Sequence, residues 1–169
     1  ATLLATSLGT VAALGLSRPH MPFKGTLMAI LISPMIVPLI ITSAGMFFFY
    51  SKIGLTHTYL GLILAHTALG TPFVVITVTA TLTGFDTNLI RASQSLGADT
   101  MRTFFKVIMP LILPGVISGG LFAFITSFDE VVVVMFIGSV EQITIPKQMW
   151  AGLRQETSPV ILCMATCLV

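Results

Sequence analysis

The chain has 169 residues, of which 55% are hydrophobic and only 8% are charged, and its formal net charge is +2. Soluble domains carry roughly 25% charged residues, so a chain with a mean hydropathy of +1.02 has too few polar side chains to cover a water-facing surface. The apolar runs are too long for barrel strands, so the composition predicts an all-α membrane protein in a lipid bilayer. The small net charge gives no reason to expect a nucleic-acid partner.

Five apolar segments are expected to form a single transmembrane helix bundle over residues 1–169. They lie at about 1–16, 25–50, 58–82, 112–137 and 158–169. A spanning helix needs roughly 20 apolar residues, so the first and last segments are expected to be partial spans of a chain truncated at both ends. Pro34, Pro38 and Pro72 interrupt the second and third segments. Neighbouring helices must satisfy the carbonyls that prolines leave free, which favours a packed bundle.

The loops predict how the chain is oriented in the membrane. If all five segments span, the loops at 17–24 and 83–109 share one side. That side holds more basic residues (Arg18, Lys24, Arg91, Arg102 and Lys106) than the other (Lys52, Lys147 and Arg154). The positive-inside rule places the more basic side in the cytoplasm.

The most informative segment is polar and lies between long apolar runs. It covers residues 90–115 and reads IRASQSLGADTMRTFFKVIMPLILPG. The pattern predicts a short helix that ends near Gly97 in the left-handed conformation, followed by a second short helix that carries Arg102 and Lys106. Asp99 is placed to cap this second helix. Two interpretations are open: an ordinary solvated loop, or a docking surface for a cytoplasmic partner.

Three titratable residues lie inside apolar segments. Asp129 and Glu130 fall in the segment 112–137, and His66 lies midway along the segment 58–82. An ionised acid near the centre of a spanning helix costs about 2.5–3.5 kcal/mol, so such residues are candidates for a transport path. For His66, a hydrogen bond between helices is the simpler role.

Small residues form a ridge N-terminal to the two acids in the sequence, at steps of four residues. They are Gly115, Gly119, Ala123 and Ser127. Ridges of this kind let two helices approach closely. If 112–137 is one helix, Glu130 falls on the ridge and Asp129 lies about 100° away around the axis. Either the ridge packs on a neighbour and Asp129 faces the path, or the ridge itself lines the path.

The polar segment resembles the signature cytoplasmic loop of the permeases of ABC importers. That signature has Glu-Ala-Ala, then three residues, a glycine and a proline-rich ending. Ala92 and Ser93 stand at the two alanine positions, Leu96-Gly97 matches the glycine step, and the ending is matched by Ile108-Met109-Pro110 and Leu113-Pro114-Gly115. Arg91 stands where the signature has glutamate, so a basic contact would replace an acidic one.

Within that family, later motifs resemble the spermidine/putrescine branch. They are Ser127-Phe128-Asp129-Glu130 followed by valines, Ile145-Pro146-Lys147-Gln148-Met149-Trp150, and Glu156-Thr157-Ser158-Pro159. The resemblance extends from about Thr26 to the end of the chain. It implies the fold of the methionine-importer permease type and a multi-pass location in the bacterial inner membrane.

The resemblance also implies partners and site residues. The partners are two ATP-binding subunits, a second permease subunit that is the same or homologous, and a periplasmic substrate-binding protein. The residues expected to couple to the ATPase, in the cytoplasmic loop at about 83–109, are Arg91, Ala92, Ser93, Leu96, Gly97, Ala98 and Arg102. The candidates for the substrate path are Asp129, Glu130 and His66, and no catalytic or metal-binding residue is expected.

The sequence contains no Gly-x-x-x-x-Gly-Lys-Ser/Thr loop, which is the usual cradle for nucleotide phosphates. We therefore expect no cofactor on this chain, with ATP and Mg on separate ATPase subunits. The expected cargo is a polyamine, and another amino compound, iron or a sugar is the alternative. An ion-driven transporter in which Asp129, Glu130 and His66 relay protons is the competing class. An enzyme is not expected, because neither a nucleophile–base pair nor a His-Glu-x-x-His motif is present.

Overall fold

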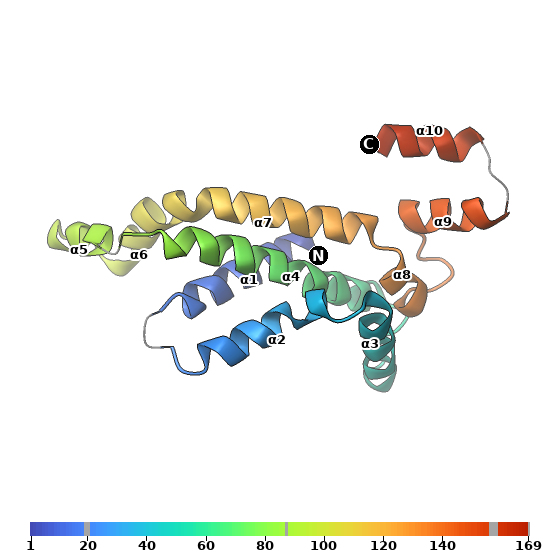
Figure 1. Ribbon diagram of the computed structural model, residues 1–169, viewed down its shortest axis with the longest axis horizontal. Helices are drawn as coiled ribbons and strands as arrows, with labels where there is room; N and C mark the ends of the chain where they lie inside the picture. Colours follow the sequence, from blue (N-terminus) through green and yellow to red (C-terminus); the bar gives the residue numbers. More distant parts are fainter. Residues whose placement is uncertain (19–20, 87, 156–158, 169) are drawn as a thin grey trace. The chain divides into compact units, whose positions relative to one another are not determined.

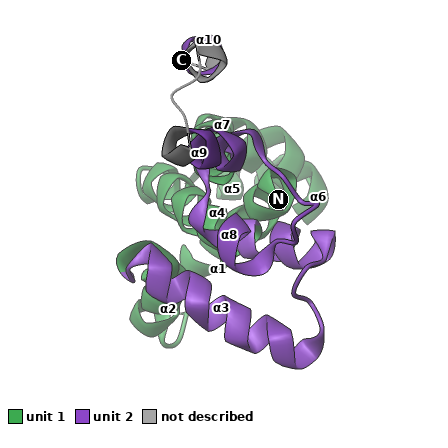
Figure 2. Ribbon diagram, turned by 90° about the vertical axis from the view of Figure 1, so that its right-hand side faces the viewer, with its two compact units in different colours: residues 1–36, 67–127 green, residues 37–66, 128–169 purple. Residues whose placement is uncertain are grey.

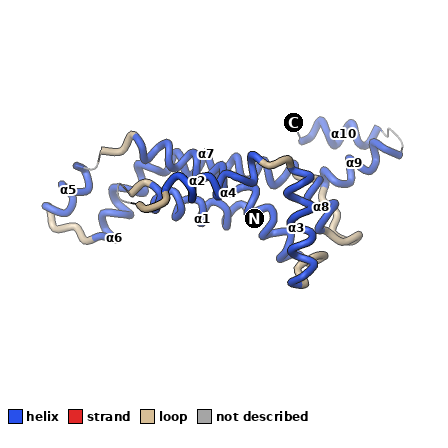
Figure 3. The backbone as a smooth tube through the Cα atoms, turned by 60° about the horizontal axis from the view of Figure 1, so that its bottom comes forward, coloured by secondary structure: helices blue, strands red, loops and turns tan. Residues whose placement is uncertain are grey.

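The computed structural model describes residues 1–18, 21–86, 88–155 and 159–168. Helices joined by short loops make up these ranges, and no strand occurs within them (Figure 3). The predicted all-α fold is confirmed. His20 and the Glu156-Thr157-Ser158 part of the last polyamine-branch motif lie outside the described residues.

The helices fall into two compact units, residues 1–36 with 67–127 and residues 37–66 with 128–169 (Figure 2). The first unit contains α1 (Thr2–Leu16), α2 (Lys24–Ile36), most of α4 (Tyr59–Thr83), α5 (Asn88–Ser95), α6 (Thr100–Thr103), the π-helix η1 (Phe104–Ile108) and most of α7 (Met109–Asp129). The second unit contains α3 (Leu39–Ile53), α8 (Val132–Ile137), α9 (Ile145–Gln155) and α10 (Pro159–Leu168).

The core of the first unit lies where α1, α4 and α7 run alongside one another (Figure 1). Its buried members are Ala5, Ala13, Val74, Val78, Ile112, Val116 and Ala123. Many of these residues are small, which lets the helix backbones approach closely, as is common in membrane bundles. A β-carbon added at Gly119 would lie 2.8 Å from Cα of Val74. The ridge on α7 therefore packs against α4, which confirms the packing part of the first interpretation, and the position of Asp129 relative to the path stays a prediction.

Two helices are long and apolar enough to cross a membrane, among the parts of the chain that are described. They are α4 and the continuous helix Thr100–Asp129, and the total is up to three if α2 and α3 count as one broken span. Large side chains such as Leu121, Phe122 and Ile125 are more than half exposed on α7. Exposed apolar side chains on such a helix are expected where lipid replaces water.

The apolar segment 25–50, expected to be one span, contains two helices. α2 ends at Ile36 and α3 begins at Leu39, with Pro38 directly before it at φ −52° and ψ 131°. Proline clashes with the carbonyl four residues earlier and disfavours helix in the residue before it. Pro34 and Pro72, by contrast, lie inside α2 and α4.

The expectation that 112–137 is one helix was wrong. α7 ends at Asp129 and a six-residue helix, α8, begins at Val132. Neither proline nor glycine stands at this break. The Glu130 carboxylate accepts a hydrogen bond from the Val133 amide instead, so the side chain replaces the carbonyl partner that a continuous helix would supply.

Two further elements differ from expectation. The second short helix of the polar segment does not stop before the prolines, because α6, η1 and α7 form one helix from Thr100 to Asp129. The π-turn lies just before Pro110, where the Met109 amide donates to the Phe104 carbonyl, and such wide turns accommodate a proline within a helix. The sequence analysis also placed no helix at 145–155, where α9 lies.

Candidate functional site

The polar segment folds into a helix–turn–helix, which we call the elbow and define as residues 88–108 (α5, α6 and η1). α5 ends in a left-handed turn at Gly97, whose φ is +83°. The Gly97 amide donates to the Gln94 carbonyl at 3.0 Å, and the Ala98 amide donates to the Ser93 carbonyl at 3.1 Å. This pair of bonds is a Schellman motif with glycine at its usual position. The predicted backbone at Gly97 is confirmed.

The second arm of the elbow begins with a side-chain cap. Asp99 is the residue before α6, and its Oδ1 accepts a hydrogen bond from the Arg102 amide at 2.8 Å. The carboxylate thereby satisfies one of the amides left free at the start of a helix. The predicted cap is confirmed, and the turn between the arms is fixed on both sides.

A hydroxyl pair ties the two arms together. Ser93 Oγ on α5 and Thr103 Oγ1 on α6 lie 2.9 Å apart, and Ser93 Oγ also donates to the Ile90 carbonyl. Because serine has one hydroxyl proton, Thr103 is the donor to Ser93 when both bonds form. Thr103 is only 3% exposed. Thr103 is not among the predicted site residues, because its only signal in the sequence is a hydroxyl on the helix that follows the glycine turn.

The outward side of the elbow is apolar at its tip and basic around it. Leu96 is 89% exposed and Met101 is 64% exposed. Arg91, Ala92 and Arg102 are also exposed, whereas Ala98 and Ser93 are partly buried. The predicted coupling residues therefore lie together on one short structure.

The elbow is rigidly continuous with a helix that can cross the membrane. α6 leads through η1 into α7 without a break. The loop after α1 lies at the same end of the first unit, because Ser17 and Arg18 line one cavity with Ile90, Thr103 and Phe104. The predicted placement of the loops 17–24 and 83–109 on one side agrees with this arrangement.

The three polar residues predicted for the substrate path differ in their surroundings. Glu130 is 7% exposed and its Oε1 accepts from the Val133 amide at 2.9 Å, so it caps α8. Asp129, the last residue of α7, is exposed, and its carboxylate makes no hydrogen bond or ion pair with the residues that the structure describes. His66 is 7% exposed within α4. The described residues contain no group of three or more His, Cys, Asp or Glu that could hold a metal ion.

The loop after α8 is held by side chains that the sequence analysis did not assign. Lys147 Nζ donates to the carbonyls of Ser139 and Gln142, at 3.2 and 3.3 Å. Gln142 Oε1 accepts from the Ser139 amide, and the His57 ring lies 3.2 Å from the Gly138 carbonyl. Lys147 belongs to the Ile145–Trp150 motif, so that motif has a structural role in fixing this loop.

Comparison with known proteins identifies the family. Residues 5–169 match the family described as "Binding-protein-dependent transport system inner membrane component". The chain belongs to this family. The resemblance to ABC importer permeases is confirmed, and the chain is a multi-pass inner-membrane member of this family.

Relatives place this family member near the polyamine branch. It is 30% identical over 169 residues to the spermidine/putrescine transport system permease protein PotC of Haemophilus influenzae, covering 100% of this chain and 66% of the relative. It is 29% identical over 165 residues to PotC of Escherichia coli K12, covering 98% and 62%. It is 28% identical over 179 residues to the putrescine transport system permease protein PotI of the same strain, covering 100% and 63%. The chain thus spans less than two thirds of the length of these relatives.

Proposed function

We propose that the chain is the permease part of an ATP-driven importer and that its elbow docks on a cytoplasmic ATPase subunit. The observation that carries this proposal is the continuity of the elbow with α7. A surface with an 89% exposed leucine at its tip is fixed by the Gly97 turn and the Asp99 cap. It leads without a break into a helix long enough to cross the membrane.

In this mechanism the chain contributes no nucleotide chemistry. ATP and Mg bind to two partner ATPase subunits, and the chain binds no cofactor. Closure of those subunits displaces the elbow, and α7 tilts with it because the helix from Thr100 onward is unbroken. This is a rigid-body switch between two states selected by nucleotide. A second permease subunit completes the path, and a periplasmic binding protein delivers the cargo.

We propose a polyamine as the cargo. The names of the relatives support this choice, since all three are permeases for spermidine or putrescine. The two acids have different surroundings, which suggests different roles. The Glu130 carboxylate accepts a hydrogen bond at the start of α8, whereas the Asp129 carboxylate is exposed at a helix break. Broken helices are typical of binding sites in transporters. Asp129 is therefore the residue proposed to meet a cationic cargo, with Glu130 and His66 supporting the structure around it.

The test is uptake of labelled spermidine by the full-length protein with its partners, in cells that lack other polyamine uptake. Asp129→Asn removes the charge and keeps the shape of the side chain. Losing one hydrogen bond to a charged group is expected to weaken uptake roughly tenfold. Glu141→Gln is the matched control, because Glu141 is also an exposed acid but lies away from the break. Equal uptake by Asp129→Asn and wild type, with normal amounts of assembled protein, would remove Asp129 from the path.

A further inference from the structure

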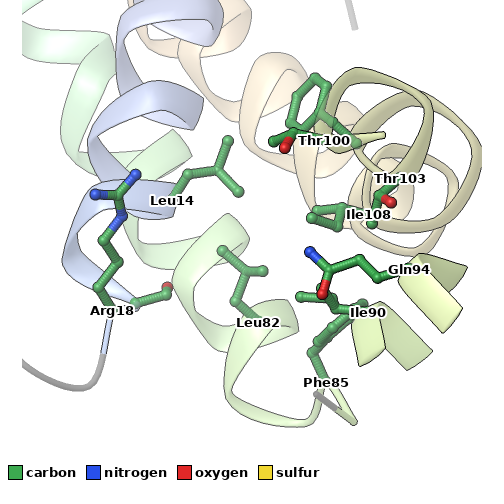
Figure 4. A pocket seen from close by; sticks show the side chains of 11 residues that line it. Leu14, Arg18, Leu82, Phe85, Ile90, Gln94, Thr100, Thr103 and Ile108 are labelled. Atoms are coloured by element: carbon green, nitrogen blue, oxygen red, sulfur yellow. The ribbon is translucent and has the colours of Figure 1, made fainter. Parts of the chain in front are cut away.

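A cavity of about 420 Å³ lies behind the elbow, within the first unit (Figure 4). It is bounded by the end of α1, the end of α4 and the inner side of α5, α6 and η1. Most of its wall is apolar, formed by Leu14, Leu82, Phe85, Ile90, Phe104 and Ile108. The transport mechanism proposed above makes no use of this space.

Two polar groups at the cavity have no partner among the described residues. No carboxylate of the described residues pairs with the exposed Arg18, and the carboxamide of Gln94 makes no hydrogen bond within the described chain. Arg18 lies on the α1 side and Gln94 on the α5 side, with Leu14 and Leu82 between them (Figure 4). The hydroxyl of Ser17, by contrast, already donates to the Ala13 carbonyl at 2.7 Å. The cation that is available at the cavity, on its α1 side, is therefore Arg18, which suits an anion.

The cavity lies at the ends of apolar helices, where the boundary between hydrocarbon and headgroups is expected. Leu14 and Leu82 are near the ends of the apolar helices α1 and α4, and Ile108 is near the start of the apolar part of the α7 helix. The elbow on the other side of the cavity carries the exposed charged side chains of Arg91, Asp99 and Arg102. Phospholipids have this same polarity, with an anionic group at one end and apolar chains at the other. Basic pockets between membrane helices on the cytoplasmic side bind anionic lipid headgroups.

We propose that this cavity binds one anionic phospholipid. Its phosphate contacts Arg18, and an acyl chain lies along Leu14, Leu82 and Ile108 toward the Gln94 side of the cavity. Such a lipid contacts the elbow and the ends of α1 and α4 at once, so it braces the elbow against the bundle. This proposal stands independently of the cargo and of the ATPase contact.

The test uses the full-length protein in its complex, reconstituted in nanodiscs made of equal parts phosphatidylglycerol and phosphatidylcholine. After mild detergent extraction, retained lipids are counted by native mass spectrometry. Arg18→Gln is expected to lower retained phosphatidylglycerol about fivefold, the value for one basic residue at a membrane surface. Gln94→Leu leaves the charge unchanged and lies across the cavity from Arg18, so it is expected to have a smaller effect. Lys24→Gln is the matched control: Lys24 is basic and exposed, follows the same loop, and is absent from the cavity wall.

Two results would overturn the proposal. One is equal loss of phosphatidylglycerol in Arg18→Gln and Lys24→Gln, which would show general attraction to basic loops. The other comes from a photoactivatable phosphatidylglycerol whose adducts are mapped by peptide mass. Adducts in the segments around Leu14 and Leu82 are expected, and adducts confined to the exposed side chains of α7 would mean that the cavity has no lipid. Because Arg18 is exposed, its substitution is expected to leave assembly of the complex unchanged, which is measured in parallel.

Discussion

Asp129 and Glu130 show how much the role of a side chain depends on its backbone. They are neighbours in sequence, yet one is an exposed acid at the end of α7 and the other is a buried cap at the start of α8. The free amides at the start of a helix favour a carboxylate. The charge of Glu130 is therefore compensated locally, and that of Asp129 is available to a ligand.

Removing the Glu130 cap is expected to reduce stability. Glu130→Ala leaves the Val133 amide without its partner and should lower the free energy of unfolding by about 1 kcal/mol, the usual effect of losing a cap. Glu130→Gln keeps a side-chain oxygen at the same position and should have a smaller effect. Thermal unfolding of the purified full-length protein in detergent measures both, and equal Tm values for wild type and Glu130→Ala would contradict the capping role.

Gly97 combines a backbone requirement with a place in the proposed docking surface. Gly97→Ala places a β-carbon at φ +83°, which costs about 1 kcal/mol, although no atom lies within 4 Å of the added carbon. Gly54→Ala is the matched control, because Gly54 has φ +70°, has open space around it and ends α3 outside the elbow. The two variants should lose similar stability, but only Gly97→Ala should also reduce cargo uptake. Equal loss of uptake in both would count against a special role of the elbow.

At the scale of elements, the sequence predicted those features that depend on a few adjacent residues. The Gly97 turn and the Asp99 cap were predicted correctly because each follows from one residue and its nearest amides. The break after Asp129 was not predicted, because neither proline nor glycine marks it. It depends on the Glu130 carboxylate, which accepts a hydrogen bond from the amide of Val133, three residues later. Pro38 ends a helix and Pro72 does not, and only the packing of neighbouring segments distinguishes such cases.

The small-residue ridge on α7 is expected to be intolerant of added volume. Gly119→Ala would place a methyl group 2.8 Å from Cα of Val74 and in contact with the Thr77 hydroxyl. Overpacking of this kind costs about 1–3 kcal/mol. Gly45→Ala is the control, because Gly45 lies within α3 with nothing within 4 Å of the new carbon. It should instead stabilise by about 0.5–1 kcal/mol through its higher helix propensity. We expect the unfolding temperature to fall for Gly119→Ala and to rise for Gly45→Ala. An unchanged unfolding temperature for Gly119→Ala would contradict the close packing of α4 and α7.

At the scale of the whole molecule, the sequence predicted the class of protein but not the contacts between distant segments. The Ser93–Thr103 bond, the Lys147 clamp on the loop after α8 and the cavity behind the elbow each join residues whose proximity the local pattern does not specify. The clearest case is the elbow itself. Two short helices were predicted, whereas the second is the start of a helix that runs on to Asp129. In the proposed mechanism, that continuity carries motion at the elbow to a spanning helix.

The central claim is that the elbow docks on an ATPase subunit, and cysteine cross-linking in native membranes tests it most directly. Leu96→Cys is introduced into the full-length protein after the exposed Cys163 and Cys167 are replaced by serine. Val140→Cys is the control, because Val140 is 90% exposed but lies in the loop after α8. We expect a nucleotide-dependent adduct between Leu96→Cys and an ATP-binding subunit, and none from Val140→Cys. Absence of that adduct in folded, abundant protein, or equal adducts from both positions, would contradict the claim.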